Sequence, residues 1–311
     1  MFFNQPIASW QDWSKVYQSI PAFAPLAAHI LQKENLPAAP LEHLSPGTNA
    51  VFRAGDVVLK IFAPPESGFN NSPCEASMGD DLQTELFAIK RANRLGIHAP
   101  RLIAEGIVDD KYRFAYMAME FIEGEEFTPK NMSEKEKFAF GQKLRAITDK
   151  MNTHCEPFNG VDVLHDKTRW ERWDKFSEHF REERAAWIEA HDFGEFVFVH
   201  GDLNGDNILI APNGELTVID FADAVLAPIA YEHALVAAAL NFDPALMRGY
   251  FGEEPVESLA RRCFEGTLIH DFGGDIAAER IAPPEEIGCL EELRRKIYHK
   301  IGGALSWPFA S

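Results

Sequence analysis

Cysteine is scarce, and its spacing excludes the common cysteine-rich sites. The 311-residue chain contains four cysteines: Cys74, Cys155, Cys263 and Cys289. They form no C-x-x-C pair and no zinc-type spacing, so they predict neither a disulfide scaffold nor a zinc site. We therefore expect reduced thiols in a cytoplasmic protein.

Long hydrophobic runs are also missing. The first residues, MFFNQPIASW, contain no basic group, which excludes the usual pattern of a secretory signal. The most apolar long stretch, residues 222–240, contains Asp223, Glu232 and His233. Because charged groups interrupt it, we expect no membrane-spanning segment.

Basic residues are outnumbered. The chain has 30 Lys and Arg against 48 Asp and Glu, a formal net charge of −18, which argues against a nucleic-acid partner. The excess of carboxylates suits a cationic substrate, although a solvated acidic surface that aids solubility explains it equally well. Hydrophobic residues make up 46% of the chain, enough for a sizeable core in one two-lobed unit or two modest domains.

The most informative stretch is residues 196–224, FVFVHGDLNGDNILIAPNGELTVIDFADA. An apolar run at 196–199 predicts a buried strand that ends before His200-Gly201-Asp202. Asn207 precedes a second short strand, and the turn Pro-Asn-Gly returns the chain through a third strand to Asp220. The expected hairpin brings Asp202, Asn207 and Asp220 together at strand ends.

Phosphoryl transfer uses this set of groups. An Asp can deprotonate an acceptor hydroxyl, while an Asn and a second Asp can bind Mg²⁺ beside the nucleotide phosphates. The H-G-D form followed by D-F resembles the aminoglycoside phosphotransferases and their relatives, which include choline, homoserine, fructosamine and methylthioribose kinases. The resemblance implies an α+β, protein-kinase-like fold of two lobes. The alternative is that these polar residues only cap an ordinary hairpin.

By this resemblance Asp202 is the catalytic residue, Asn207 and Asp220 hold Mg²⁺, and the nucleotide is ATP or GTP. The sequence departs from the family's usual H-G-D-L-H-P-G-N at Asn204 and Gly205, which replace a His-Pro pair. Asp206 adds a negative charge close to the expected metal site.

A hairpin over residues 44–52 and 57–61 is expected nearer the start of the chain. Its small residues let backbone N–H groups approach phosphates. The resemblance places the nucleotide loop at Gly47, Thr48 and Asn49 and a phosphate-binding lysine at Lys60. An outward-facing lysine on an alternating strand is the alternative for Lys60.

The partner expected for Lys60 is Glu85. Residues 63–81 read as a loop and 81–95 as a helix, and Glu85 falls on the apolar face of that helix. An inward carboxylate needs a cation, and kinases use such a Lys–Glu pair to position phosphates. Glu75, in the expected loop, is a competing candidate.

Two strands, 101–104 and 114–122, should lead into a linker between the lobes. The resemblance assigns the adenine-binding backbone to Glu120 and Ile122, with Met119 behind the base. An edge strand running into a linker predicts the same residues.

The remainder of the chain should be mainly helical. Ser133 and Glu136 predict a capping box, and residues 170–190 and 231–240 predict further helices. A second D-F-G-like segment at 271–273 has no H-x-D at hairpin distance before it, so we interpret it as a decoy for magnesium. Acidic residues expected to line the substrate side are Asp223, Glu232, Glu265, Asp271 and Asp275.

Three segments are therefore expected: a helical extension at 1–40 with no assigned role, a nucleotide-binding lobe at 41–122 and a catalytic and substrate-binding lobe at 123–311. The function indicated is a phosphotransferase that moves the γ-phosphoryl group of ATP or GTP to a hydroxyl of a small, amine-bearing, aminoglycoside-like molecule. A kinase for choline, homoserine, fructosamine or a sugar, or a non-catalytic nucleotide-binding module on the same scaffold, is the alternative.

Overall fold

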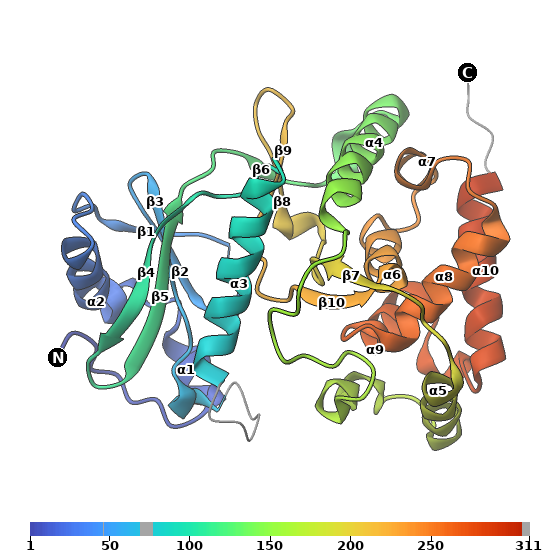
Figure 1. Cartoon of the computed structure of the whole chain (residues 1–311), viewed down its shortest axis with the longest axis horizontal. Coiled ribbons are helices and arrows are strands. Elements are labelled where there is room, and N and C mark those ends of the chain that lie inside the picture. Colours follow the sequence, from blue (N-terminus) through green and yellow to red (C-terminus); the bar gives the residue numbers. More distant parts are fainter. Residues whose placement is uncertain (46, 69–76, 307–311) are drawn as a thin grey trace. The chain divides into compact units, whose positions relative to one another are not determined.

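The computed structural model describes residues 1–45, 47–68 and 77–306. It contains two compact units, Met1–Glu123 and Gly124–Ser311, which follow one another along the colour bar of Figure 1. Glu75 lies outside the described residues. None of the helices in the described part of the chain is long and apolar enough to cross a membrane.

The first unit is built on a five-stranded antiparallel sheet with the strand order β1-β2-β3-β5-β4. Its strands are β1 Leu41–His43, β2 Ala50–Ala54, β3 Val57–Ile61, β4 Leu102–Asp109 and β5 Arg113–Glu120. A tight turn joins β2 to β3, and Gly55 adopts a positive φ of 65° there, a conformation that glycine accepts without steric cost. The expected hairpin is present, but its first strand begins at Ala50 and not at Leu44.

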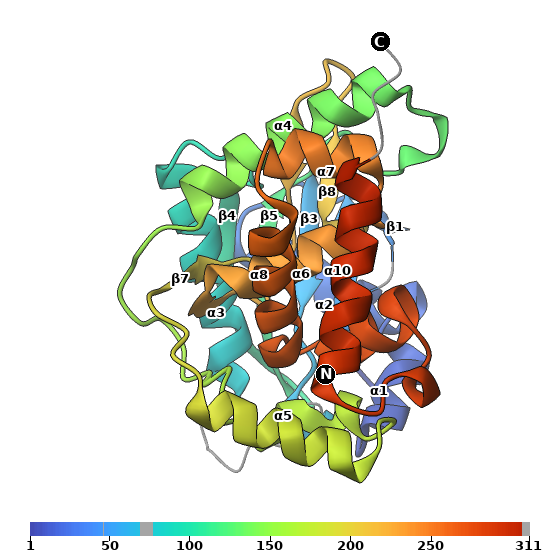
Figure 2. The ribbon, with the colours of Figure 1, turned by 90° about the vertical axis from the view of Figure 1, so that its right-hand side faces the viewer.

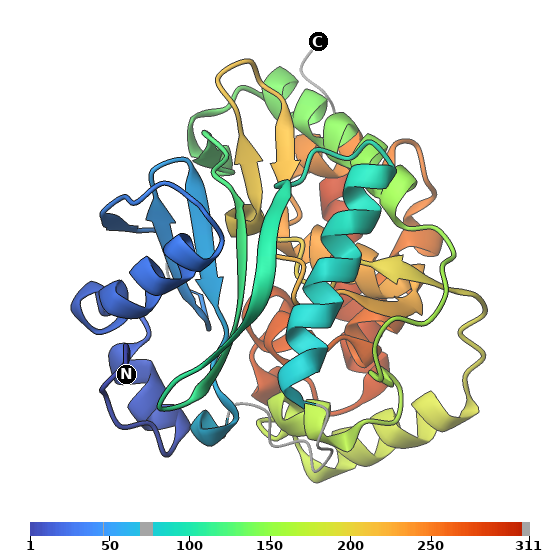
Figure 3. The ribbon, with the colours of Figure 1, turned by 60° about the vertical axis from the view of Figure 1, so that its left-hand side comes forward.

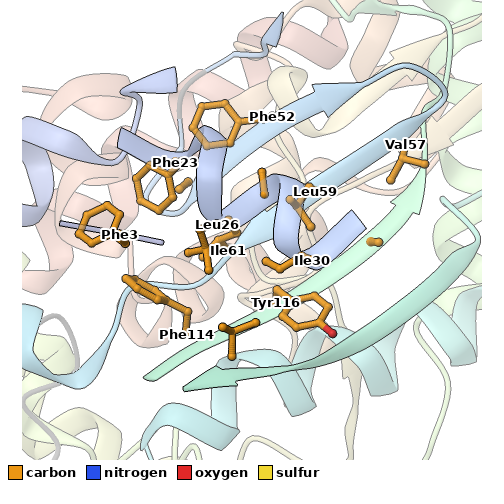
Figure 4. Packing of buried hydrophobic residues seen from close by; sticks show 14 of the residues in the cluster. Phe3, Phe23, Leu26, Ile30, Phe52, Val57, Leu59, Ile61, Phe114 and Tyr116 are labelled. Carbon is orange, nitrogen blue, oxygen red and sulfur yellow. The ribbon is translucent and has the colours of Figure 1, made fainter. Parts of the chain in front are cut away.

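Helices cover both faces of this sheet. Helix α2 (Ile20–Lys33) lies along one face and α3 (Ser77–Arg94) along the other, as Figures 1 and 3 both show. Because side chains alternate along a strand, Leu59 and Ile61 point into the core on the α2 side (Figure 4). Lys60, between them, takes the α3 side.

The amino-terminal segment belongs to this core. Helix α1 (Trp10–Val16) and α2 contribute Trp13 and Phe23, and the chain before them contributes Phe3, to the same cluster of buried residues as Phe52 and Phe114. Figure 4 shows several of these aromatic rings gathered over the sheet. Burial of such side chains stabilises the fold by roughly 1.5–3 kcal/mol each, so residues 1–40 form part of the first unit's core.

Helix α3 begins earlier than expected. It starts at Ser77, whereas the sequence predicted a loop through residue 81. Gly79 lies in this first turn, and a glycine in a helix costs only about 1 kcal/mol relative to alanine, so it does not prevent the helix from starting at Ser77. The 3₁₀ turn η1 (Pro65–Ser67) occupies part of the preceding segment.

The second unit contains two small antiparallel sheets. One pairs β7 (Phe196–Val199) with β10 (Val225–Pro228). The other has the order β6-β8-β9, formed by Glu125–Glu126, Ile208–Ile210 and Leu216–Val218. The β8–β9 hairpin confirms the turn predicted from Pro-Asn-Gly.

Helices make up most of the second unit. They are α4 Glu134–Met151, α5 Glu178–Ala190, α6 Ile229–Ala239, α7 Pro244–Phe251, α8 Val256–Ile269, α9 Gly273–Asp275 and α10 Leu290–Ser306, with 3₁₀ turns η2 Pro129–Asn131, η3 Lys167–Trp173, η4 Gly205–Asn207 and η6 Pro284–Glu286 and the π-helical segment η5 Ile276–Ile281. Helix α8 packs against both α6 and α10, and α4 packs against α7. Figure 2 shows α6, α8 and α10 next to one another. The capping box of Ser133 and Glu136 is confirmed at the start of α4.

The helix expected over residues 170–190 is wrong as a single element. The structure has the 3₁₀ turn η3 up to Trp173 and then α5 from Glu178. The Ser177 hydroxyl accepts a hydrogen bond from the Phe180 backbone N–H and starts α5 as a new helix. Trp173 and Phe176 nevertheless stack with Phe180, so these aromatic side chains pack together across the break.

Candidate active site

His200 links two backbone segments of the candidate site in the second unit through hydrogen bonds of its ring. It follows β7 directly and is completely buried. Its Nε2 lies 3.0 Å from the carbonyl oxygen of Ile219, and its Nδ1 lies 3.2 Å from the backbone nitrogen of Asp202. A backbone N–H can only donate and a carbonyl can only accept, so His200 is a neutral imidazole that carries its proton on Nε2. The ring thereby joins the end of β7 to the residue before Asp220.

Gly201 can only be glycine at this point of the chain. Its φ is 81°, and an added Cβ would lie 2.1 Å from the carbonyl oxygen of Asp223. The Gly201 N–H donates to Glu232 Oε2 at 3.1 Å, and Glu232 is completely buried. Burial raises the pKa of Glu232 to about 7, against the lowering effect of its backbone hydrogen bonds.

Asp202 is held by two amides. Its Oδ1 accepts a hydrogen bond from Asn204 Nδ2 and its Oδ2 accepts one from Asn207 Nδ2, both at 2.9 Å. Burial, followed by the negative charges of Asp223 and Asp220, raises the pKa of Asp202 to about 7, although the two amides lower it. The structure therefore brings Asp202, Asn207 and Asp220 together with Asp223.

The chemistry of the donor set fits a magnesium ion. Asn207 also donates through Nδ2 to the backbone oxygen of Asp202 at 2.7 Å, so both amide protons are used toward Asp202 and Oδ1 is turned away from it. The Ile219 N–H donates to the Asn207 backbone oxygen at 3.0 Å, which places Asp220 beside Asn207. Amide and carboxylate oxygens are the ligand types Mg²⁺ prefers. Asp220 has a positive φ of 56°, a conformation uncommon for a residue with a side chain and typical of sites where function holds the backbone.

The residues that replace the family's His-Pro pair have defined places. Asn204 donates to Asp202, and its Oδ1 accepts from the Asp206 N–H at 2.9 Å. Asp206 itself is exposed. The sequence signalled that this turn departs from the family pattern but did not show that Asn204 contacts the Asp202 carboxylate, because that contact depends on side-chain direction.

The five acidic residues expected on the substrate side lie in different surroundings. Asp223 is close enough to raise the pKa of Asp202, whereas Glu232 is fully buried and binds the Gly201 N–H. The other three lie beside basic residues of the chain: Asp271 beside Arg169 at 3.5 Å, Glu265 beside His191 at 3.6 Å, and Asp275 beside Arg172 at 2.6 Å and beside Lys175.

Arg169 is a residue of this region that the sequence analysis missed. Burial lowers its pKa, but Tyr231 and Asp271, followed by Asp223, raise it above its ordinary value. The Asp271 N–H donates to the Tyr231 hydroxyl at 3.2 Å. Nothing in the local sequence distinguishes Arg169 from the neighbouring Lys167 and Arg172, so only the fold identifies it.

In the first unit, Lys60 and Glu85 form the expected ion pair. Lys60 Nζ lies 2.8 Å from Glu85 Oε2, and the two side chains are 5% and 1% exposed. The outward-facing alternative for Lys60 is therefore wrong. A buried charge pair is costly to desolvate and is weak evidence for stability, which favours a functional reason for keeping it.

The expected nucleotide loop and linker residues also lie in the first unit. Gly47 and Thr48 are exposed, and Asn49 is buried, with its Oδ1 accepting from the Ala63 N–H at 3.1 Å. In β5, Met119 is buried, and the Glu120 N–H donates to the Arg101 carbonyl at 3.0 Å. Ile122 follows β5 and is partly buried.

Solved structures share this fold at low sequence identity. An amicoumacin kinase, hAmiN, solved with AMP-PNP, Ca²⁺ and Ami, is 13% identical with a TM-score of 0.60, covering 92% of this chain and 95% of its own. A microcompartment-associated aminopropanol kinase is 16% identical with a TM-score of 0.57, covering 90% and 95%. The choline kinase LicA from Streptococcus pneumoniae is 15% identical with a TM-score of 0.54, covering 90% and 98%.

These likenesses confirm the expected fold class, a protein-kinase-like α+β fold with a small sheet-containing lobe and a mainly helical lobe. A search of curated protein sequences finds no match. A family model described as the phosphotransferase enzyme family matches residues 48–260. That match covers more than half of the chain and includes Lys60, Asp202, Asn207 and Asp220, so the chain belongs to the phosphotransferase enzyme family.

Proposed function

We propose that this small-molecule kinase transfers the γ-phosphoryl group of ATP or GTP to a hydroxyl of a small, amine-bearing molecule of the aminoglycoside type. The observation that carries the proposal is the Asp202 carboxylate, held between Asn204 and Asn207 and raised in pKa to about 7. A carboxylate with such a pKa is suited to accept a proton near neutral pH.

Asp202 is assigned the role of general base. The acceptor hydroxyl oxygen forms a bond to the γ-phosphorus as the bond from that phosphorus to the β,γ-bridging oxygen breaks, and the hydroxyl proton goes to Asp202. Asn204 and Asn207 fix the direction of the carboxylate through their hydrogen bonds. Positioning and charge neutralisation supply most of the rate enhancement in this class of reaction.

Asn207 Oδ1 and the Asp220 carboxylate are the groups we assign to Mg²⁺. When bound, Mg²⁺ neutralises negative charge on the nucleotide phosphates. From the first unit, Lys60 would contact the α- and β-phosphates while Glu85 holds its ammonium in place. The loop Gly47, Thr48 and Asn49 would cover the phosphates.

We assign the base of the nucleotide to the linker segment. The backbone of Glu120 and Ile122 would bind its edge, and the buried Met119 would lie behind it. Backbone recognition of this kind leaves the choice between ATP and GTP to small differences in donor and acceptor position. We place the enzyme in the cytoplasm, where both nucleotides are found.

For the substrate, Asp223 is the acidic residue we assign to an ammonium group. Its charge acts on Asp202, so an amine bound there would lie near the reacting hydroxyl. Asp271 offers a second carboxylate, already paired with Arg169. A kinase for choline, homoserine, fructosamine or a sugar would use the same phosphoryl-transfer chemistry with a different substrate contact.

The proposal is tested by turnover with Asp202→Ala. We expect the variant to lose at least about 100-fold in kcat, because a positioned general base contributes roughly 10²–10⁴-fold, while the Kd for nucleotide stays within about twofold. The matched control is Asp206→Ala, which removes an exposed carboxylate from the same turn. The measurement is ADP or GDP release with a panel of aminoglycosides, amino alcohols, amino acids and sugars.

Retained turnover in Asp202→Ala would refute the assigned role of Asp202. Nucleotide binding by the wild-type protein without turnover on any member of the panel would favour the non-catalytic module. Turnover with choline or a sugar but with no aminoglycoside would refute the proposed substrate class. It would not contradict the proposed roles of Asp202, Asn207 and Asp220.

A further inference from the structure

A buried side chain of the segment 1–40 contacts the candidate nucleotide loop. Trp13, in α1, is completely buried, and its indole Nε1–H donates a hydrogen bond to the backbone carbonyl of Thr48 at 2.8 Å. The two residues are 35 positions apart in the sequence. The bond therefore joins an element without an assigned role to the loop proposed to cover the phosphates.

Trp13 is itself held firmly. Its ring packs edge-on against Phe23 at a centroid distance of 5.8 Å and belongs to the core cluster of the first unit. Helix α1 is fixed at its start by Ser9, whose hydroxyl accepts from the Asp12 N–H at 3.2 Å. Because the Trp13 ring is held by this packing, its N–H has little conformational freedom. It therefore restrains the Thr48 carbonyl more than a donor on an exposed side chain would.

The loop is restrained at two consecutive residues. Trp13 holds the carbonyl of Thr48, and the Ala63 N–H, just after β3, donates to the Asn49 side chain at 3.1 Å. Gly47, by contrast, is exposed, and a Cβ added there would meet no atom within 4 Å. Gly47 is therefore unrestrained by neighbouring side chains, whereas hydrogen bonds hold the Thr48–Asn49 peptide that follows it.

Fixing that carbonyl also fixes the neighbouring N–H. The peptide between Thr48 and Asn49 is trans, like the other peptide bonds of the described chain. In a planar trans peptide the C=O and N–H point in opposite directions, so the Asn49 N–H is directed away from Trp13. Backbone N–H groups in such loops are the usual donors to phosphate oxygens.

We propose that Trp13 is a positioning residue for nucleotide binding, which holds the Thr48–Asn49 peptide in the orientation that receives the phosphates. The inference rests on the proposed function and gives residues 1–40 a role in it. A preordered loop binds more tightly because less conformational freedom is lost on binding.

The test compares Trp13→Phe with Trp10→Phe in the full-length protein. The first change keeps an aromatic ring in the core and removes the N–H. The second alters a tryptophan on the same helix that is 39% exposed. We expect Trp13→Phe to raise the Kd for nucleotide by about 2- to 10-fold, the effect of one hydrogen bond, with kcat at saturating nucleotide unchanged. Trp10→Phe should match the wild type.

A second measurement separates positioning from packing. In nucleotide-free protein, the ¹⁵N order parameter of the Asn49 amide should fall in Trp13→Phe from about 0.85 toward about 0.6, the range of a flexible backbone. A lower Tm with unchanged Kd and unchanged order parameter would overturn the proposal, since Trp13 would then be a core residue only. A fall in the order parameter without a change in Kd would overturn it as well.

If Trp13→Phe does not fold, a benzothienyl-alanine at position 13 keeps the ring shape and replaces the N–H by sulfur, and the same outcomes apply. Wild-type protein that binds no nucleotide would overturn the proposed function and this proposal with it. Tight wild-type binding that persists in the Trp13 variants would overturn this proposal alone.

Discussion

Two carboxyl groups, that of the half-buried Asp202 and that of the fully buried Glu232, meet around the Gly201 peptide. Asp202 follows it, and Glu232 accepts its N–H. The pKa of each is raised to about 7, by burial first and then, for each, by the charge of neighbouring acids. A buried acid with a raised pKa keeps its proton in the folded state over a pH range in which the unfolded chain has lost it. These groups therefore contribute stability that is lost as the pH rises.

We predict a pH-dependent effect of Glu232→Gln on stability. Below pH 4.5 the Glu232 side chain is protonated in both the folded and the unfolded state, so it adds no pH dependence there. Between pH 4.5 and about pH 7 the Glu232 side chain loses its proton in the unfolded state but keeps it in the folded state. The wild type therefore loses stability relative to the variant as the pH rises through this range. Across this pH window, the free energy of unfolding of Glu232→Gln should rise relative to that of the wild type by on the order of 3 kcal/mol. The measurement is denaturant unfolding without nucleotide or metal.

The control for this experiment is Glu253→Gln, which changes an exposed acid in the same unit. Because this side chain is exposed, we expect the change to alter the free energy of unfolding by no more than about 0.5 kcal/mol at either pH. A Glu232→Gln difference that is also independent of pH would show that Glu232 is ionised in the folded protein.

At the scale of elements, the contact between α4 and α7 in the second unit depends on glycine. Helices α4 and α7 cross where an added Cβ at Gly249 would lie 2.2 Å from the Phe138 carbonyl oxygen, and one at Gly141 would lie 2.5 Å from the Leu246 carbonyl oxygen. Both contacts are with backbone atoms, which cannot rotate aside as a side chain can. The crossing therefore leaves no room for a methyl group on either helix.

We predict that Gly249→Ala destabilises the protein by about 1–3 kcal/mol, as overpacking of a well-packed contact does. The matched control is Gly303→Ala in α10, where an added Cβ meets no atom within 4 Å. Alanine there should be neutral or stabilise by up to about 1 kcal/mol, because it is the better helix former. Thermal unfolding of both variants gives the comparison, and equal Tm values would contradict the packing described.

Several elements could be predicted and others could not, for identifiable reasons. The capping box of Ser133 and Glu136 and the β8–β9 hairpin have strong local signals, and both are present. Strands β6 and β10 were missed for different reasons. Strand β6 consists of two glutamates, a residue type depleted in strands. Strand β10 lies within the apolar stretch 222–240, where periodicity does not distinguish a buried strand from a buried helix. The long helix expected over 170–190 is divided, because the Ser177 side chain caps the start of a new helix.

At the scale of the whole molecule, each unit contains some of the residues that we propose for nucleotide and metal binding. Lys60 and Glu85 belong to the first unit, and Asn207 and Asp220 to the second. A ligand that binds only the folded state stabilises it by an amount that grows with its concentration, about 2.7 kcal/mol at 100 times Kd. Nucleotide and magnesium should therefore raise Tm together.

We predict that Asp220→Ala removes the magnesium-dependent part of this stabilisation. In the wild type, ATP or GTP with Mg²⁺ should raise Tm by several degrees more than the same nucleotide with a chelator, since each 1 kcal/mol corresponds to a few degrees. In Asp220→Ala the two conditions should give the same Tm, whereas Asp206→Ala should behave as the wild type does. A full magnesium effect in Asp220→Ala would exclude Asp220 as a ligand.

The sequence alone predicted which residues carry the chemistry, and it determined the local elements on which they stand. Asp202, Asn207 and Asp220 could be named because short apolar strands and a Pro-Asn-Gly turn are local features, readable without a fold. Only the tertiary structure decided which side chains meet: Lys60 with Glu85, Asn204 with Asp202, Glu232 with the Gly201 N–H, and Trp13 with Thr48. Those contacts join residues by side-chain direction and packing, which depend on the whole folded chain and leave no pattern in the order of its residues.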